Sequence, residues 1–119
     1  MGVERCDYVI VGVKLDYDEF WSIQGGDEAA HDKFQEFYDN EYREEIGSKD
    51  GVTVISDGMN GKYVYIGYVI KKAREGQGLG HTKCKSSKEQ KAALRMILPV
   101  LFNLKEIPPI NVWIFSHYY

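Results

Sequence analysis

The segment REGQGLGHTKCKSS, residues 74 to 87, combines glycines with basic side chains, a histidine and a cysteine. Glycine-rich loops ahead of a helix bind phosphate groups through backbone N–H groups. Here the glycines alternate as G-x-G-x-G and six residues separate the last of them from Ser87. A dinucleotide-binding loop needs G-x-G-x-x-G opening directly into the helix. We therefore expect an ordinary loop followed by a capped helix. The alternative is an anionic-ligand site made of Gly78, Gly80, Lys83, Lys85 and Lys88.

Thiol and imidazole groups occur in two pairs that could do chemistry. His81 and Cys84 are close in sequence, but two ligands do not make a zinc site. Cys6 and His117 would approach each other if the first and last strands are neighbours, yet no third group that would orient the imidazole can be identified. The sequence therefore predicts no catalytic residue, no metal site and no cofactor, and we expect a protein that is not an enzyme.

Acidic side chains are concentrated in a helix predicted over residues 27–46. Its apolar stripe recurs at helical spacing and consists of Ala30, Phe34, Phe37, Tyr38, Tyr42 and Ile46. Asp32, Glu36 and Asp39 lie on the side away from this stripe. The simplest interpretation is a solvated helix face. The alternative is a carboxylate array that docks on a basic patch of a partner protein, where such charges steer the encounter.

Alternation of side chains gives the predicted strands two apolar faces. One face would hold Val9, Val11, Val13, Val64, Ile66, Tyr68, Ile70, Val112 and Ile114. The other would hold Tyr8, Ile10, Tyr63, Tyr65, Val69, Trp113, Phe115 and His117. If helices cover only the first face, the second needs a cover of its own. We expect the loop 15–26, which carries Phe20, Trp21 and Ile23, to fold over it. A second copy of the chain, another protein or a nucleic acid are the alternatives.

The elements that position these residues follow one another as strand 7–15, helix 27–46, strand 52–57, strand 62–72, a helix beginning after Ser87 and strand 111–118. Ser87 and Gln90 form a capping box, and Pro99 should kink or shorten the second helix. The order βαββαβ is the split βαβ pattern of ferredoxin-like domains. We predict an α+β fold with a four-stranded, mainly antiparallel sheet and two helices on one face. The first and third strands would be central, and the fourth would border the first.

Composition indicates one globular domain over residues 1–119. The chain is 44% hydrophobic and 28% charged, which is an ordinary globular balance. The longest apolar run, residues 96–102, is too short to span a bilayer. Glu4 and Asp7 lie where an export signal would be basic and then apolar. We therefore expect a cytoplasmic protein without a membrane partner. The net charge of -3 combines -10 in residues 1–60 with +7 in residues 61–119. The two halves could form separate acidic and basic surfaces or interleave.

The stretch YVYIGY, residues 63–68, partly matches the third-strand motif of RNA-recognition domains, in which two aromatic side chains stack on bases. The basic residue and glycine that open that motif appear here in reverse order, as Gly61-Lys62. The acidic first half opposes phosphate binding. Binding of single-stranded nucleic acid, a nucleotide or another phosphorylated ligand is therefore the alternative function, through Tyr63, Tyr65, Trp113 and the basic loop.

Residues 57–70, DGMNGKYVYIGYVI, together with the terminal FSHYY, resemble small uncharacterised accessory proteins of tailed bacteriophages. The resemblance covers about a third of the chain and implies a viral protein, made during infection, that binds a host component. It carries over no functional residue. Our leading prediction is a small protein-binding module, an inhibitor or modulator of a host protein, with homodimerisation through the sheet as an alternative. The predicted contact residues are Asp32, Glu36, Asp39, Tyr63, Tyr65, Trp113 and Phe115.

Overall fold

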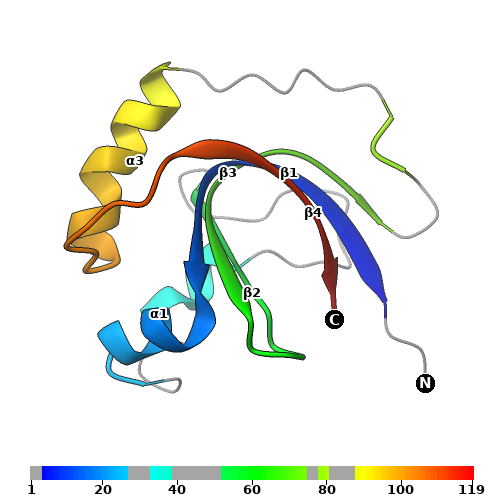
Figure 1. Ribbon diagram of the computed structural model, residues 1–119. Helices are drawn as coiled ribbons and strands as arrows, with labels where there is room; N and C mark the ends of the chain where they lie inside the picture. The colour runs from blue at the N-terminus through cyan, green and yellow to red at the C-terminus, as the bar shows by residue number, and fades with distance from the viewer. Residues whose placement is uncertain (1–3, 27–32, 39–51, 75–77, 81–87) are drawn as a thin grey trace.

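A computed structural model of the chain describes residues 4–26, 33–38, 52–74, 78–80 and 88–119. Its strands are β1 (Arg5–Asp16), β2 (Val52–Ser56), β3 (Tyr63–Arg74) and β4 (Asn111–Tyr118). Its helices are α1 (Tyr17–Ile23), the 3-10 turn η1 (Gln35–Phe37) and α3 (Lys88–Leu101). Figure 1 shows that the strands form an arched sheet, with α1 and α3 beside the same limb of the arch.

The sheet has the order β2-β3-β1-β4, and all neighbouring strands are antiparallel. The predicted α+β class and four-stranded antiparallel sheet are therefore confirmed. β1 and β3 are central and β4 borders β1, as the sequence predicts. The strands are rich in β-branched and aromatic residues, which suit a pleated surface that is buried on both sides.

Two glycines let the central strands approach each other closely. Gly12 of β1 lies opposite Gly67 of β3. A Cβ on Gly12 would lie 2.0 Å from the Ile66 carbonyl oxygen, and one on Gly67 would lie 2.1 Å from the Val11 carbonyl oxygen. Both obstacles are backbone atoms, so no rotamer change could relieve the contact. Further along, the register shifts between Val9 and Ile10, which marks a β-bulge.

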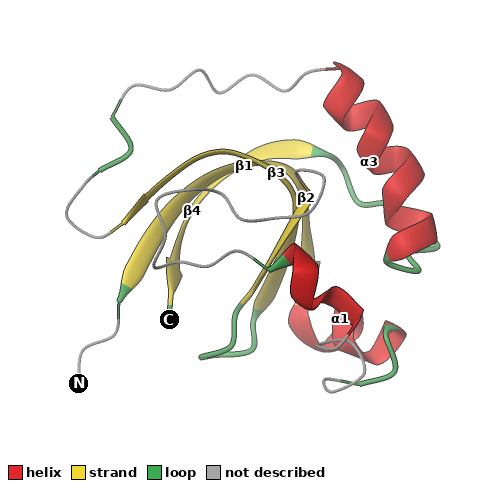
Figure 2. Ribbon diagram, turned by 180° about the vertical axis from the view of Figure 1, so that it is seen from behind, coloured by secondary structure: helices red, strands yellow, loops and turns green. Residues whose placement is uncertain are grey.

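One side of the sheet carries the main hydrophobic core. α1 contributes Phe20 and Trp21, and α3 contributes Leu94 and Leu98. The strands contribute Val11, Val13, Val52, Val54, Val64 and Ile66, and Phe34, Phe102 and Leu104 complete the cluster. Figure 2, seen from behind, shows the same grouping of α1 and α3 beside one limb of the arch.

Helix α1 corrects the prediction for residues 15–26, which we expected to form a loop over the second face of the sheet. The segment forms a helix, and its Phe20 and Trp21 pack into the main core instead. Asp16 caps the helix by accepting the N–H of Glu19 at 3.1 Å. Asp18 and Glu19 in the first turn stabilise the helix, because their negative charges lie near the positive end of the helix dipole. Seven residues give too few turns for a periodic apolar stripe, so the local signals are the cap and the acidic first turn.

The helix predicted over residues 27–46 falls largely outside the described residues. Within 33–38, η1 spans Gln35–Phe37, Phe34 is buried in the main core, and Tyr38 forms a parallel bridge with Val54 of β2. The chain therefore places this segment beside β2, on the main-core side.

Helix α3 includes Pro99 and continues to Leu101. Ser87, which would form the predicted capping box, lies outside the described residues. After the helix Asn103 has φ 57°, and the Leu104 N–H is 3.4 Å from the Leu98 carbonyl oxygen. This is the left-handed C-cap that ends many helices. No helix in the described part of the chain is long and apolar enough to cross a membrane.

The hairpin between β2 and β3 is organised by Asp57, which is 3% exposed. Its Oδ1 accepts the N–H groups of Met59 at 3.3 Å and Asn60 at 3.0 Å, and its Oδ2 accepts the Lys62 N–H at 3.1 Å. Gly61 has φ +62°, as the predicted turn requires. This turn fixes the start of β3, and with it the position of Tyr63.

Candidate functional site

The face of the sheet opposite α1 and α3 carries a second cluster, which we call the aromatic face. Its buried members are Cys6, Tyr8, Ile10, Ile55 and Tyr65, and Tyr63, Val69, Trp113, Phe115 and Tyr119 pack against them. The predicted division of the strand residues between two faces is confirmed for Tyr8, Ile10, Tyr63, Tyr65, Val69, Trp113 and Phe115. Ile114, expected in the main core, is 63% exposed because it lies on an edge strand.

The rings of the aromatic face cover one another. Tyr65 and Phe115 stack with ring centroids 3.7 Å apart and planes 5° apart. Trp113 meets Tyr65 edge-on with centroids 5.8 Å apart, and its indole N–H donates to the Gly12 carbonyl oxygen at 3.0 Å. The structure thus brings all four predicted aromatic contact residues together, but as a packed cluster. Base stacking needs a free ring face, and Tyr65 is only 5% exposed.

Tyr63 and His117 are joined at the end of the aromatic face. The Tyr63 hydroxyl lies 2.9 Å from Nδ1 of His117, which is 3% exposed. Burial, with a smaller effect from the Asp57 carboxylate, raises the pKa of the Tyr63 phenol well above its ordinary value. The phenol therefore keeps its proton at neutral pH, and the tautomer of the His117 ring decides which of the two groups donates the hydrogen bond.

Cys6 lies directly opposite His117 in the β1–β4 ladder, as the strand order predicted. Its thiol is fully buried, which removes the access that a nucleophile needs. Tyr119 stacks on His117 with centroids 6.1 Å apart, and burial followed by the Glu4 charge raises the pKa of its phenol. Among the described residues, no group of three or more His, Cys, Asp or Glu side chains could hold a metal ion.

The predicted anionic-ligand loop is described only in part. Gly78 and Gly80 are exposed and have φ +71° and +59°, a conformation that favours glycine. Lys88 is exposed at the start of α3. Lys83 and Lys85 lie outside the described residues, so these five residues are not placed as one site.

The predicted acidic contact surface has the same limit. Glu36 is exposed in η1. Asp32 and Asp39 lie outside the described residues.

Sequence reasoning missed an apolar surface on the outer side of α3. Met96 is 75% exposed and Val100 is 78% exposed, one helical turn further on. Pro99 beside them is exposed, and Ile23 at the end of α1 is 48% exposed. We call these four residues the aliphatic surface. The signal was available, since Met96 and Val100 are four apart and lie off the stripe that packs inward.

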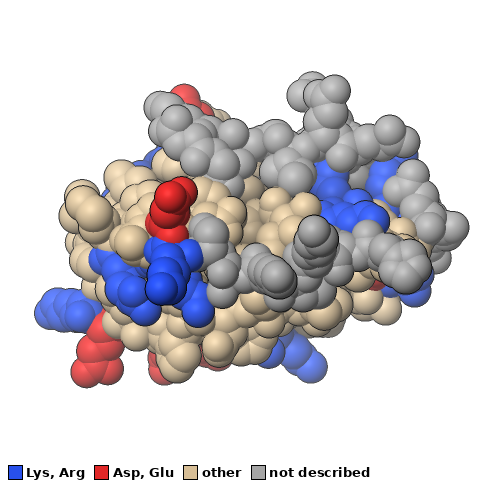
Figure 3. Space-filling view, turned by 90° about the horizontal axis from the view of Figure 1, so that it is seen from above, with Lys and Arg blue, Asp and Glu red and all other residues tan. Residues whose placement is uncertain are grey.

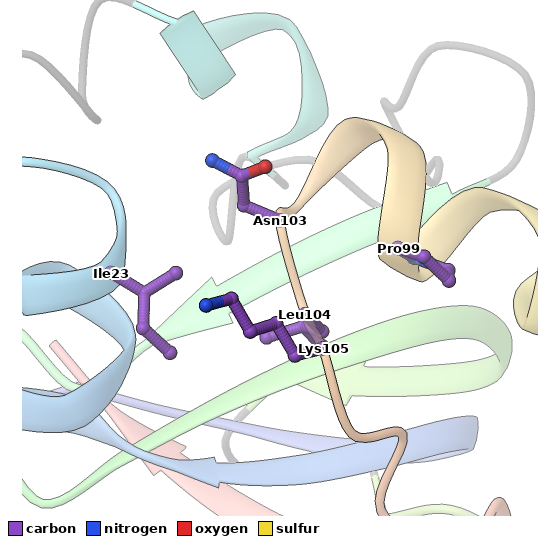
Figure 4. Close-up of a pocket in the computed structure, with 5 residues that line it drawn as sticks. All are labelled: Ile23, Pro99, Asn103, Leu104 and Lys105. Atoms are coloured by element: carbon purple, nitrogen blue, oxygen red, sulfur yellow. The ribbon is translucent and has the colours of Figure 1, made fainter.

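Two adjoining hollows extend the aliphatic surface between α1 and the segment after α3. Ile23, Pro99, Asn103, Leu104 and Lys105 line the first, which has a volume of about 550 Å³. In Figure 4 the Lys105 side chain extends across it toward Ile23. The second, of about 760 Å³, shares four of these residues and continues along Leu15, Glu19 and residues 106–109.

Opposite charges flank the aliphatic surface. Lys88, Lys91 and Arg95 lie along the first two turns of α3, where Lys88 and Arg95 are exposed and Lys91 is half-buried, with Glu89 as the counter-charge. Figure 3 shows Lys and Arg side chains gathered where α3 lies. On the other side, α1 begins with Asp16, Asp18 and Glu19, all exposed. The surface therefore lies between a basic and an acidic flank, and Lys105 crosses the hollow at its centre.

Comparison with known proteins identifies no relative. No protein-family model matches the chain, and no curated protein or solved structure matches it.

Proposed function

We propose that this chain is a non-enzymatic protein-binding module and that the aliphatic surface is its contact surface. The observation that carries the proposal is the exposure of Met96 (75%) and Val100 (78%) on a helix whose opposite side is already buried in the core. The second half of α3 thus carries apolar side chains on its outer side as well as on the side that packs into the core. Contiguous exposed apolar groups mark interaction surfaces.

The hollow beside Pro99 gives a partner a place to anchor. Its volume of about 550 Å³ falls in the range of binding pockets. An aromatic or aliphatic side chain inserted between Ile23 and Pro99 would be desolvated on several sides, as hot-spot residues are. Full burial of either Met96 or Val100 would contribute roughly 1.5–3 kcal/mol to the free energy of binding, before the costs of association are subtracted.

The flanking charges set the orientation of the partner. A partner that places acidic groups opposite Lys91 and Arg95 and basic groups opposite Asp18 and Glu19 would be attracted, and the reversed orientation would be repelled. Charges at the rim of an interface act mainly on association rate and specificity.

The proposal takes the target to be a host protein, as the resemblance to phage accessory proteins implies, and the chain to act in the cytoplasm as an inhibitor or modulator. It also takes the arrangement of strands and helices to be of the ferredoxin-like kind. The nucleic-acid alternative has weaker support, because Tyr65, one of the rings it requires, is 5% exposed and is stacked against Phe115.

Affinity purification from the native cell tests the proposal. The tagged chain should retain a specific protein, and the double variant Met96→Asp, Val100→Asp should lose it, because two carboxylates would be buried in an apolar contact. Met59→Asp is the matched control, since Met59 is 51% exposed in the hairpin turn, away from α3. The retained fraction should also be analysed for nucleotides. Equal capture by the double variant and the control would contradict the proposal.

A further inference from the structure

The two edges of the sheet differ in how they are covered. At the β2 edge, Tyr38 forms a bridge with Val54, so a described segment lies alongside. At the other edge, no described strand pairs with the outer side of β4, whose course to the C-terminus can be followed in Figure 1. An uncovered edge strand is a template for pairing with another chain.

The backbone groups on the outer side of β4 follow from the end of its ladder with β1. Glu4 and Tyr119 exchange two backbone hydrogen bonds, each 3.0 Å long. In an antiparallel ladder such hydrogen-bonded pairs alternate with pairs that point outward. The β1–β4 pairing runs without a register shift, so His117, Phe115 and Trp113 bond to β1. The N–H and C=O groups that point outward belong to Val112, Ile114, Ser116 and Tyr118.

β4 also lacks the features that usually protect an edge. Its sequence NVWIFSHY contains no Lys, Arg, Asp, Glu or Pro. Ile114 is 63% exposed and Tyr118 is 47% exposed. Natural edge strands are blunted by charges, proline or bulges. An eight-residue edge without any of these is suited to pairing.

We propose that β4 is a homodimer interface, in which β4 of a second copy pairs with it antiparallel about a two-fold axis at Phe115. This register pairs Ile114 with Ser116 of the second copy and Val112 with Tyr118 of the second copy. It is the symmetric register that uses all four outward-pointing residues. Each outward-pointing N–H group then meets a carbonyl oxygen of the second copy, and the sheets of the two copies become continuous.

A second copy fits this edge because the edge is complementary to itself. A two-fold axis presents the same strand to each copy, and antiparallel pairing satisfies both. No like charges meet, because the strand carries none. An axis perpendicular to the sheet keeps both aromatic faces on the same side. The partly exposed Phe115 would then pack against Phe115 of the second copy, and Ile114 would be covered on the opposite face.

Sedimentation velocity over a wide range of concentration tests the proposal. The unaltered chain should show a monomer–dimer equilibrium. Ile114→Lys should raise the dimer dissociation constant about tenfold or more, because a charge at an edge opposes pairing. Tyr118→Lys should act in the same direction. Met59→Lys, at an exposed apolar site in the turn, is the matched control, and circular dichroism with a thermal melt should show that each variant is folded.

A disulfide tests the register. In the variant Ile114→Cys, Ser116→Cys, made with Cys84→Ser, mild oxidation should give covalent dimers, because hydrogen-bonded pairs have Cα atoms about 5.5 Å apart, within disulfide range. Each single cysteine should crosslink poorly, because neither position faces itself across the proposed axis.

Three results would overturn the dimer proposal. The first is a chain that is monomeric at every concentration. The second is a dimer that Met96→Asp, Val100→Asp dissociates and Ile114→Lys leaves intact, which would place the dimer on the aliphatic surface. The third is a dimer whose double-cysteine variant crosslinks no better than the single ones.

Discussion

Tyr63 links the hairpin turn to the last strand through one side-chain hydrogen bond, to His117 of β4. Tyr63→Phe removes the bond and keeps the ring contacts, so we expect a loss of about 1 kcal/mol in the free energy of unfolding at neutral pH. Urea denaturation followed by tryptophan fluorescence would measure it. Tyr118→Phe, at an exposed phenol, is the control and should be close to neutral.

The same phenol makes stability depend on alkaline pH. Burial and the Asp57 charge raise the pKa of Tyr63 in the folded chain, so the unfolded chain releases this proton first. Its contribution to stability is present below the unfolded pKa of about 10 and is lost as pH rises above that value. The free energy of unfolding, measured at increasing pH, should therefore decrease less steeply for Tyr63→Phe than for the unaltered chain. Parallel curves would contradict this origin.

Single residues were predictable where the local sequence decides their environment. Asp57 and Asn60-Gly61 indicated a turn, and the structure adds the three N–H groups that Asp57 accepts. Asn103, with its positive φ, was not predicted, because its conformation depends on where α3 ends against α1. The Gln24 side chain fixes that place by donating to the Phe102 carbonyl oxygen, a contact between residues 78 apart.

At the scale of elements, the glycine pair in the central strands gives a sharp prediction. Gly12→Ala should destabilise the fold by about 3 kcal/mol, because its Cβ would collide with the backbone of β3. Gly58→Ala is the matched control, since a Cβ there meets nothing within 4 Å. Thermal or urea unfolding would measure both. Equal stability of the two variants would show that β1 and β3 can separate without cost.

The elements themselves were predictable where alternation or a run of β-branched residues marks them, even in the five residues of β2. β1 and β3, of 12 residues each, carry enough alternation to assign both faces, down to Val69 and Ile70. α1 has seven residues and was missed, because its adjacent Phe20 and Trp21 give no periodic pattern. The cap at Asp16 is a weak signal by itself. The helix is stabilised because Phe20 and Trp21 pack into the core, and this packing cannot be deduced from the local sequence.

At the scale of the molecule, the aliphatic surface and the β4 edge belong to different elements and should act independently. Ile114→Lys should leave capture of the partner protein unchanged, and Met96→Asp, Val100→Asp should leave the dimer dissociation constant unchanged. Combining them should remove both properties additively, as expected for separate sites. Sedimentation and affinity capture on the same four proteins would measure this. A loss of both properties in either parent variant would show that the two surfaces are coupled.

The candidate site was less predictable than the fold. Alternation and helical spacing showed which residues share a face, but exposure depends on what the rest of the chain places over that face. The rings chosen from the sequence, Tyr65 above all, proved to be packed together. Met96 and Val100 belong to the apolar run 96–102, but the sequence did not indicate their exposure, because the inward stripe of α3 already explained an apolar helix.

The pairing of Glu4 with Tyr119 has a mechanical consequence. The two described ends of the chain lie side by side at one end of a single antiparallel ladder. Tension applied between them would fall on one hydrogen-bonded pair at a time and peel β4 from β1, beginning at Tyr119. A protein pulled in this way yields at low force, whatever its thermal stability.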